Sequence, residues 1–384
     1  MGGERLRFSI AQAAPAAVGG IYLPFFPLWL TGQGLEASQI SLVLACAMFL
    51  RIFISPTAGI VADALGDRRR VAMACAALAS LAFGLMAGLG PVFGLAAILP
   101  LMLIAVPLNS ATGPIVEAVT ARGAIDYRFD YARVRLWGSL AFVVTNYLGG
   151  LAIGFTGAGA VAWMVSVMLA GCAIAFWPLP PLLSDRRTER KAMGRAIQRI
   201  FSEGRVLLRQ PVFLLFLLTV TFAQTAHAVF YAFGTITFRS FGYTDSYIGV
   251  LWASGTLAEV ALFAFGGRVT RSAPATGLIA LGVALGAVRW IGMAFDTGQV
   301  GVLLLQLLHA GSFGLVHLGT MKFLSLAVPA RLAATGQSLF AVMAYGLGMV
   351  TAYVLNRLFV FRAGAPAARS AWRFAVVNAF AVVQ

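Results

Sequence analysis

A small set of ionisable side chains lies inside long apolar stretches of this sequence. If those stretches cross a bilayer, each charge costs at least about 2.5–3.5 kcal/mol at the bilayer centre and needs a partner or a water-filled cavity. The set consists of Arg51, Glu117, Arg135, His227, Glu259, Arg289, His309, His317 and Lys322. Both halves of the chain contain acids and bases of this kind, which suits a binding site served by both halves.

Glu117 and Arg135 stand near facing ends of the fourth and fifth apolar stretches. An arginine released from its glutamate can hold a carboxylate through two charge-assisted hydrogen bonds. We therefore predict that this pair, with Asn109 in the same fourth stretch, binds substrate. Two alternatives stay open for the pair, which are a proton site and a purely structural ion pair.

Glu259, Arg289 and His309 form a second candidate group, in the eighth to tenth stretches. Histidine changes its charge near neutral pH, and a buried glutamate gains or loses a proton as neighbouring charges change. Glu259 is the leading candidate for a coupling proton, with Arg289 and His309 adjusting its proton affinity.

Three further polar residues occupy one face of the seventh stretch. Gln224, His227 and Tyr231 follow an i, i+3, i+7 spacing, which places them in line on a helix. They are predicted to form the wall of a substrate pocket with hydrogen-bonding tips, and a polar seam between helices is the alternative.

The composition indicates whether these apolar stretches lie in water or in a membrane. Of 384 residues, 60% are hydrophobic and only 11% are charged, whereas soluble domains contain about 25% charged residues. The apolar runs are long and continuous, so they predict helices and not the alternating strands of a membrane barrel. We expect an all-α membrane protein with twelve spans, at 8–31, 39–65, 71–90, 92–119, 134–156, 160–179, 211–234, 246–267, 274–295, 300–328, 333–357 and 370–384.

One long basic segment, residues 184–210, separates the sixth span from the seventh. Basic loops stay on the cytoplasmic side, which puts both termini in the cytoplasm. The predicted domains are 1–180, a linker at 181–210, and 211–384. Two features disagree with this topology: Arg357, Arg362 and Arg369 fall in a predicted outer loop, and the last span has only about 15 residues, or about 22 Å of helix against a 30 Å core.

The two halves resemble each other. Residues 34–40 align with 242–248, and residues 109–117 align with 309–317. Arg133 and Gly138 match Arg331 and Gly336 at a nearly constant offset. A parallel six-plus-six duplication is typical of transporters in which two bundles enclose a central cavity near the bilayer midplane.

The segment 59–70, GIVADALGDRRR, resembles the signature of the major facilitator superfamily between its second and third helices. The resemblance implies a gating motif formed by Gly59, Asp63, Gly66, Arg68 and Arg69. Glycines allow close helix approach, and the basic residues hold the loop at the inner surface. Ala64 stands where the family has a basic residue.

Segments 115–118 and 131–138 look like the region of lactose permease, an oligosaccharide:proton symporter, in which a glutamate and an arginine hold the sugar; these correspond to Glu117 and Arg135. Segments 288–292 and 308–309 look like its proton-handling region, and Glu259 matches a further glutamate. Ser312 replaces the proton-carrying glutamate of that family, so its mechanism does not carry over unchanged.

The 3-phenylpropionate permease-like branch of the superfamily is more similar still, through segments 135–139, 224–231, 257–260 and 307–309 together with His317. The resemblance implies an inner-membrane secondary transporter that couples protons to an aromatic monocarboxylate such as 3-phenylpropionate. Sugar or nucleoside symport is the main alternative, and proton-coupled drug efflux is a weaker one.

Other classes lack their sequence signals. There is no phosphate-binding loop for ATP hydrolysis and no metal-binding spacing. Cys46, Cys75 and Cys172 are odd in number and scattered through apolar runs. The net charge is +15, and the basic residues lie between the predicted spans. They are interpreted as a signal for orientation in the membrane and not as a nucleic-acid-binding surface. We expect no enzyme activity, no cofactor beyond protons as coupling ions, and a monomer that contacts lipid and a small substrate.

Overall fold

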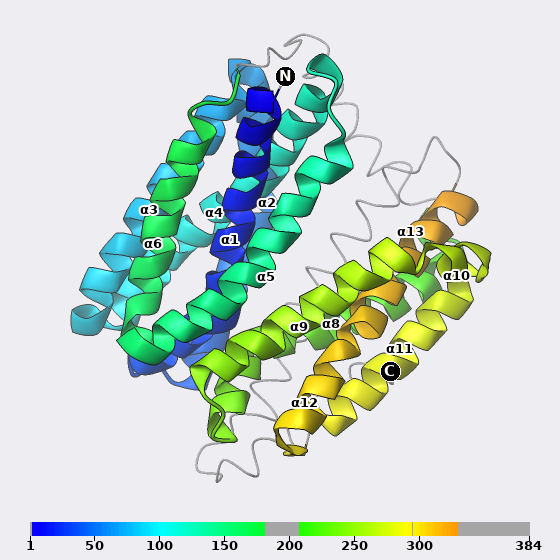
Figure 1. The fold of residues 1–384 in the computed structure, drawn as a ribbon. Coiled ribbons are helices and arrows are strands. Elements are labelled where there is room, and N and C mark those ends of the chain that lie inside the picture. Colours follow the sequence, from blue (N-terminus) through cyan, green and yellow to red (C-terminus); the bar gives the residue numbers. More distant parts are fainter. Residues whose placement is uncertain (1, 181–206, 294, 329–384) are drawn as a thin grey trace. The chain divides into compact units, whose positions relative to one another are not determined.

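The computed structural model describes residues 2–180, 207–293 and 295–328, and these form helices joined by short turns. Figure 1 shows their order along the chain. The first set is α1 (Gly2–Gly32), α2 (Ala37–Leu65), α3 (Arg68–Phe93), α4 (Leu95–Asp126), α5 (Tyr131–Thr156), the short η1 (Ala158–Ala160) and α6 (Val161–Phe176). The second set is α8 (Pro211–Ser240), α9 (Asp245–Phe265), α10 (Gly267–Ser272), α11 (Ala275–Gly292), α12 (Gly298–Leu307), η2 (Ala310–Leu315) and α13 (Val316–Ala327).

Within the described residues, 10 helical segments are long and apolar enough to cross a membrane. They coincide with the first ten predicted spans, the tenth being the continuous run of α12, η2 and α13. Helices prevail because a bilayer leaves every backbone hydrogen bond to be made within the segment itself. The predicted spans at 333–357 and 370–384 lie outside the described residues, as does most of the basic segment. The predicted domain boundaries at 180 and 210 stay predictions.

The described residues divide into two compact units, 2–180 with 244–250, and 207–243 with 251–293 and 295–328. In the first unit, α1 packs along α5 and α6, while α3 packs along α4 and α6 (Figure 1). A pair of reciprocal hydrogen bonds joins α3 to α6, because Ser80 and Ser166 each donate a hydroxyl to the other's backbone carbonyl at 2.8 Å.

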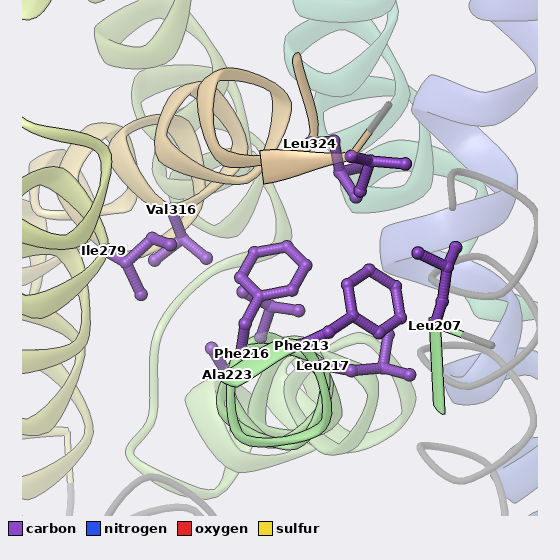
Figure 2. Packing of buried hydrophobic residues seen from close by; sticks show 10 residues of the cluster. Leu207, Phe213, Phe216, Leu217, Ala223, Ile279, Val316 and Leu324 are labelled. Atoms are coloured by element: carbon purple, nitrogen blue, oxygen red, sulfur yellow. The ribbon is translucent and has the colours of Figure 1, made fainter. Parts of the chain in front are cut away.

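In the second unit, the apolar face of α8 packs against α11 and α13 (Figure 2). Phe216 of α8 stacks on Phe323 of α13 with ring centroids 4.0 Å apart. Side chains of Ile279 and Val316 complete this contact on the neighbouring helices. The cluster consists of Leu207, Phe213, Phe216, Leu217, Val220, Ala223, Ile279, Val316, Leu324 and Val328.

Two glycines allow α11 to lie close to the run of η2 and α13. A Cβ on Gly282 would come within 2.6 Å of Val316 Cγ2 and 2.9 Å of the Gly311 carbonyl oxygen. A Cβ on Gly319 would come within 2.7 Å of Ile279 Cγ1. Small residues at such crossings are how membrane helices pack tightly, and this crossing brings Arg289 of α11 to η2.

We expect Gly282→Ala to destabilise the protein by about 1–3 kcal/mol, because the added methyl group has no room at the α11 crossing. The measurement is the thermal unfolding midpoint of the purified protein in detergent. Gly171→Ala on α6 is the matched control, since a Cβ there meets nothing within 4 Å. Equal midpoints for the two variants would contradict the close crossing.

Candidate functional site

Arg289 lies at the centre of a buried polar cluster in the second unit. Its side chain is 1% exposed. Its Nη2 donates to Gln306 Oε1 at 2.6 Å, and its Nη1 donates to Ser312 Oγ at 3.1 Å. The guanidinium carbon also lies 5.0 Å from the ring centroid of Phe230 and 4.4 Å from that of Trp290. A buried cation is therefore surrounded by neutral acceptors and aromatic faces, which suit a desolvated guanidinium.

Two histidines face the same guanidinium. Arg289 Nη1 lies 3.4 Å from His227 Nε2 and 3.2 Å from His309 Nδ1. Nη1 carries two hydrogens for three neighbours, the two ring nitrogens and Ser312 Oγ, so they share its hydrogen bonds. The other nitrogen of His227 lies 3.0 Å from the Ala223 carbonyl oxygen and therefore carries the hydrogen. Since arginine only donates, these contacts favour rings whose nitrogens present lone pairs to Arg289.

His309 connects the arginine to Glu259. Its Nε2 lies 3.4 Å from Glu259 Oε2, and both side chains are largely buried. Because Nδ1 faces the Arg289 donor, Nε2 is the ring nitrogen that faces the carboxylate, at 3.4 Å. Arg289, His309 and Glu259 therefore form one chain of contacts, and the three residues predicted for proton coupling lie together. Their role in coupling stays a prediction.

Local helix geometry positions these groups. Gln306 and His309 are three residues apart on one helix face. The π-helical segment η2 follows at Ala310–Leu315 and turns Ser312 toward Arg289. Such segments inside longer helices occur often at functional sites. On α9, a Cβ on Gly255 would lie 3.4 Å from His309 Cβ, so the small residue lets α9 approach, and Glu259 follows one turn later.

The second predicted group, Glu117 and Arg135, forms an ion pair within the first unit. Arg135 Nε donates to Glu117 Oε1 at 3.0 Å. A third partner comes from α1, because Gln12 donates its amide to Glu117 Oε2. Thr120 in turn donates its hydroxyl to Gln12 Oε1 at 3.2 Å. Unlike Arg289, the Arg135 side chain is 60% exposed.

The remaining residues predicted to bind substrate are Asn109, Gln224, His227 and Tyr231. Asn109 is half-buried on α4, about 12 Å along the helix from Glu117. Gln224 is half-buried on α8. The ring of Tyr231 lies 6.2 Å from that of His227 and 5.8 Å from that of Trp252. His227 thus joins the Arg289 cluster, while the substrate roles of Asn109, Gln224 and Tyr231 stay predictions.

The predicted gating motif forms the turn between α2 and α3. Gly66 adopts φ +69°, a left-handed conformation that glycine tolerates. Asp67 caps α3 by accepting a hydrogen bond from the Arg70 backbone at 3.2 Å. Arg69 Nη1 donates to the carbonyl oxygens of Trp177 and Leu179 at 3.2 and 3.1 Å. The motif therefore fixes this turn to the end of α6.

The other predicted members of the motif lie on either side of this turn. Gly59 is half-buried on α2, and a Cβ there would meet nothing within 4 Å. Arg68 is the first residue of α3. Asp63 lies on α2, and its side chain is outside what the structure describes. A gating role for the motif stays a prediction.

The sequence analysis did not assign four residues that the structure adds. They are Gln12, Asp67, Thr120 and Gln306. Gln306 had a usable signal, since it is a lone amide inside an apolar run, one turn before His309. Gln12 and Thr120 had none, because their partners lie on helices far away in the sequence. In the described part of the chain, no three His, Cys, Asp or Glu side chains gather as metal ligands would.

The long apolar helices and the buried charges define the class of this protein, a multi-pass all-α membrane protein. The model of the MFS_1 like family matches residues 16–353, and the chain belongs to this family of the major facilitator type. It is 29% identical over 311 residues to a "Probable 3-phenylpropionic acid transporter" of Escherichia coli (strain K12), covering 80% of this chain and 78% of that protein. It is also 24% identical over 329 residues to a lactose permease of Klebsiella oxytoca, covering 82% and 78%.

Solved structures agree on the fold. The crystal structure of the nucleoside transporter NupG superposes with a TM-score of 0.82 at 16% identity, covering 98% of both chains. A D-xylose-proton symporter gives a TM-score of 0.69 at 12% identity, covering 99% of this chain and 95% of the other. At such identities the likeness establishes the fold and nothing about the substrate. The expected major facilitator fold is confirmed.

The hydrogen bonds of Arg69 predict that its loss destabilises the protein more than loss of the neighbouring Arg70. We expect Arg69→Gln to destabilise the protein by about 1.5–3 kcal/mol, because two carbonyl oxygens at the end of α6 lose a charged donor. Arg70→Gln is the control, since that side chain is 77% exposed and its pairing with Asp67 is worth about 0.5 kcal/mol. Thermal unfolding of both variants in detergent is the measurement, and a larger loss for Arg70→Gln would contradict the assignment.

Proposed function

We propose that this protein is a secondary active transporter that moves a small organic solute together with protons. The observation that carries the proposal is the buried chain of Arg289, His309 and Glu259. A chain of ionisable groups inside a membrane bundle is typical of proton relays. The transporters and permeases among its relatives support the same conclusion.

Within this chain, Glu259 is the group that takes the coupling proton. A proton on His309 Nδ1 would face the Arg289 guanidinium, which is itself a donor. A proton on Glu259 meets no such conflict with Arg289. Protonation of Glu259 also removes the charge that attracts His309, 3.4 Å away, so the link between α9 and the Arg289 cluster weakens when the proton binds.

For the substrate, we propose an aromatic monocarboxylate such as 3-phenylpropionate, held through Arg135. A guanidinium binds a planar carboxylate with two parallel hydrogen bonds. The relative from Escherichia coli supports this choice by its described substrate. Sugar or nucleoside symport is the second candidate, favoured by the Glu117 carboxylate beside Arg135, which suits hydroxyl groups, and by lactose permease among the relatives. Proton-coupled drug efflux is the third.

The remaining features of the proposal follow from the class of protein. We propose that the chain resides in the bacterial inner membrane with both termini in the cytoplasm, because its basic residues cluster in the loops on that side. We propose that it acts as a monomer, catalyses no reaction and needs no cofactor, since a proton gradient supplies the driving force.

We expect Glu259→Gln to abolish accumulation driven by a pH gradient while exchange of labelled for unlabelled substrate continues, because the amide cannot take up the proton. Uptake and exchange of 3-phenylpropionate in proteoliposomes measure the two activities. Glu36→Gln, an exposed change in the loop before α2, should leave both intact. A Glu259→Gln variant that still concentrates substrate would overturn the coupling role.

We expect Arg135→Lys to weaken binding of 3-phenylpropionate by about 10–100-fold, because lysine cannot form the two-pronged contact. Competition against labelled substrate gives the affinity. Arg133→Lys is the matched control on the same helix, since its side chain is 70% exposed and pairs with Asp130. Displacement of the label by sugars or nucleosides, and not by aromatic acids, would favour the second candidate function.

A further inference from the structure

Gln12 completes the surroundings of the Glu117 carboxylate. Each carboxylate oxygen accepts one hydrogen bond, Oε1 from Arg135 and Oε2 from the Gln12 amide. Gln12 comes from α1, whereas the ion pair joins α4 to α5. The position of the carboxylate is therefore determined by three helices, and the ion pair alone does not set it.

Glu117 determines which way the Gln12 amide faces, and Thr120 supports that orientation. A carboxylate only accepts hydrogen bonds, so the NH₂ group of Gln12 must point to Glu117 and its oxygen must point away. That oxygen accepts from the Thr120 hydroxyl at 3.2 Å. Thr120 is fully buried one turn beyond Glu117 on α4. Thr120 thus donates to Gln12 and Gln12 donates to Glu117, so every donor in this chain faces an acceptor.

The arrangement leaves the terminal fork of Arg135 open. Its hydrogen bond to Glu117 uses Nε, at 3.0 Å. In the part of the chain that the structure describes, no residue accepts from its Nη1 or Nη2, and the side chain is 60% exposed. These two nitrogens present parallel donors, which match the two oxygens of a carboxylate.

We propose that Gln12 is a specificity-determining residue that reserves the terminal fork of Arg135 for the carboxylate of an anionic substrate. This inference rests on the proposed function. With Gln12 in place, Glu117 Oε2 is held by an amide and cannot turn to the arginine fork. Without it, Glu117 can rotate, place both oxygens on Arg135 in a bidentate pair, and compete directly with the substrate carboxylate.

The same geometry distinguishes an anion from a neutral hydroxyl ligand. A sugar bound by this pair would need free acceptor positions on Glu117 for its hydroxyl groups. Here each Glu117 oxygen already accepts one hydrogen bond, from Gln12 or Arg135, and keeps one further lone pair, whereas both open groups of Arg135 are donors. Two parallel donors match the two oxygens of a carboxylate better than they match separate hydroxyl groups.

The test compares two ligands that differ only in their head group, 3-phenylpropionate and its neutral amide, 3-phenylpropionamide. Inhibition constants for both are measured by competition against labelled 3-phenylpropionate, with wild-type protein and Gln12→Leu in proteoliposomes. We expect the wild type to prefer the carboxylate. In Gln12→Leu this preference should fall by about tenfold, through weaker binding of the carboxylate with little change for the amide.

Gln33→Leu is the matched control, because it makes the same change just beyond the opposite end of α1 and should keep the wild-type preference. Thr120→Val is a second variant, which removes the hydroxyl that donates to the Gln12 amide oxygen and leaves Gln12 itself in place. It should reduce the preference in the same direction by a smaller factor, and it provides the test if Gln12→Leu does not fold.

Two failures can be told apart. A wild type that prefers the carboxylate, with Gln12→Leu or Thr120→Val keeping that preference in full, overturns the role of Gln12 and leaves the proposed function standing. A loss of affinity that is equal for both ligands also overturns it, since that pattern indicates a general structural effect. A wild type that binds neither ligand overturns the proposed substrate together with this inference.

Discussion

The cost of holding a guanidinium away from water governs the second unit of this protein. Arg289 is fully enclosed by protein groups, and an isolated charge in such a place would be prohibitively unfavourable. Its compensation comes from α8, through His227, and from the run of α12 and η2, through Gln306, His309 and Ser312. Those helices must therefore keep a fixed register relative to α11, which makes the polar cluster a structural constraint as well as a candidate site.

The neutral character of these partners bears on the proposed coupling role. Arg289 is surrounded by an amide, a hydroxyl and two imidazole rings, and the Glu259 carboxylate lies beyond His309, 3.4 Å from its Nε2. The charge separation along this chain changes when a proton is added or lost at Glu259.

In the first unit, the charged side chains form a direct ion pair that is more exposed than Arg289. Glu117 and Arg135 touch directly, are more exposed, and are supported by the half-buried Gln12 and the buried Thr120. Sequence alignment of the two halves places Asn109 and Glu117 opposite His309 and His317. Corresponding positions of the two halves thus carry different chemistry, in keeping with the proposed substrate site in one half and the proposed proton site in the other.

The sequence by itself determined the membrane class, the first ten helices and the short set of ionisable residues from which any site had to be built. It could do so because the length of an apolar run and the cost of a charge within it are local properties. It also indicated the pairing of Glu117 with Arg135 and of Glu259 with Arg289 and His309, through resemblance to a family.

Only the tertiary structure decided which groups touch. Gln12 and Thr120 are separated from each other by more than a hundred residues and meet only because α1 packs on α4. Ser312 reaches Arg289 because η2 is wound as a π-helix and because Gly282 lets α11 come close, a combination that no helical periodicity predicts. Contacts between helices depend on crossing distances and local winding, and these are set by packing over the whole unit.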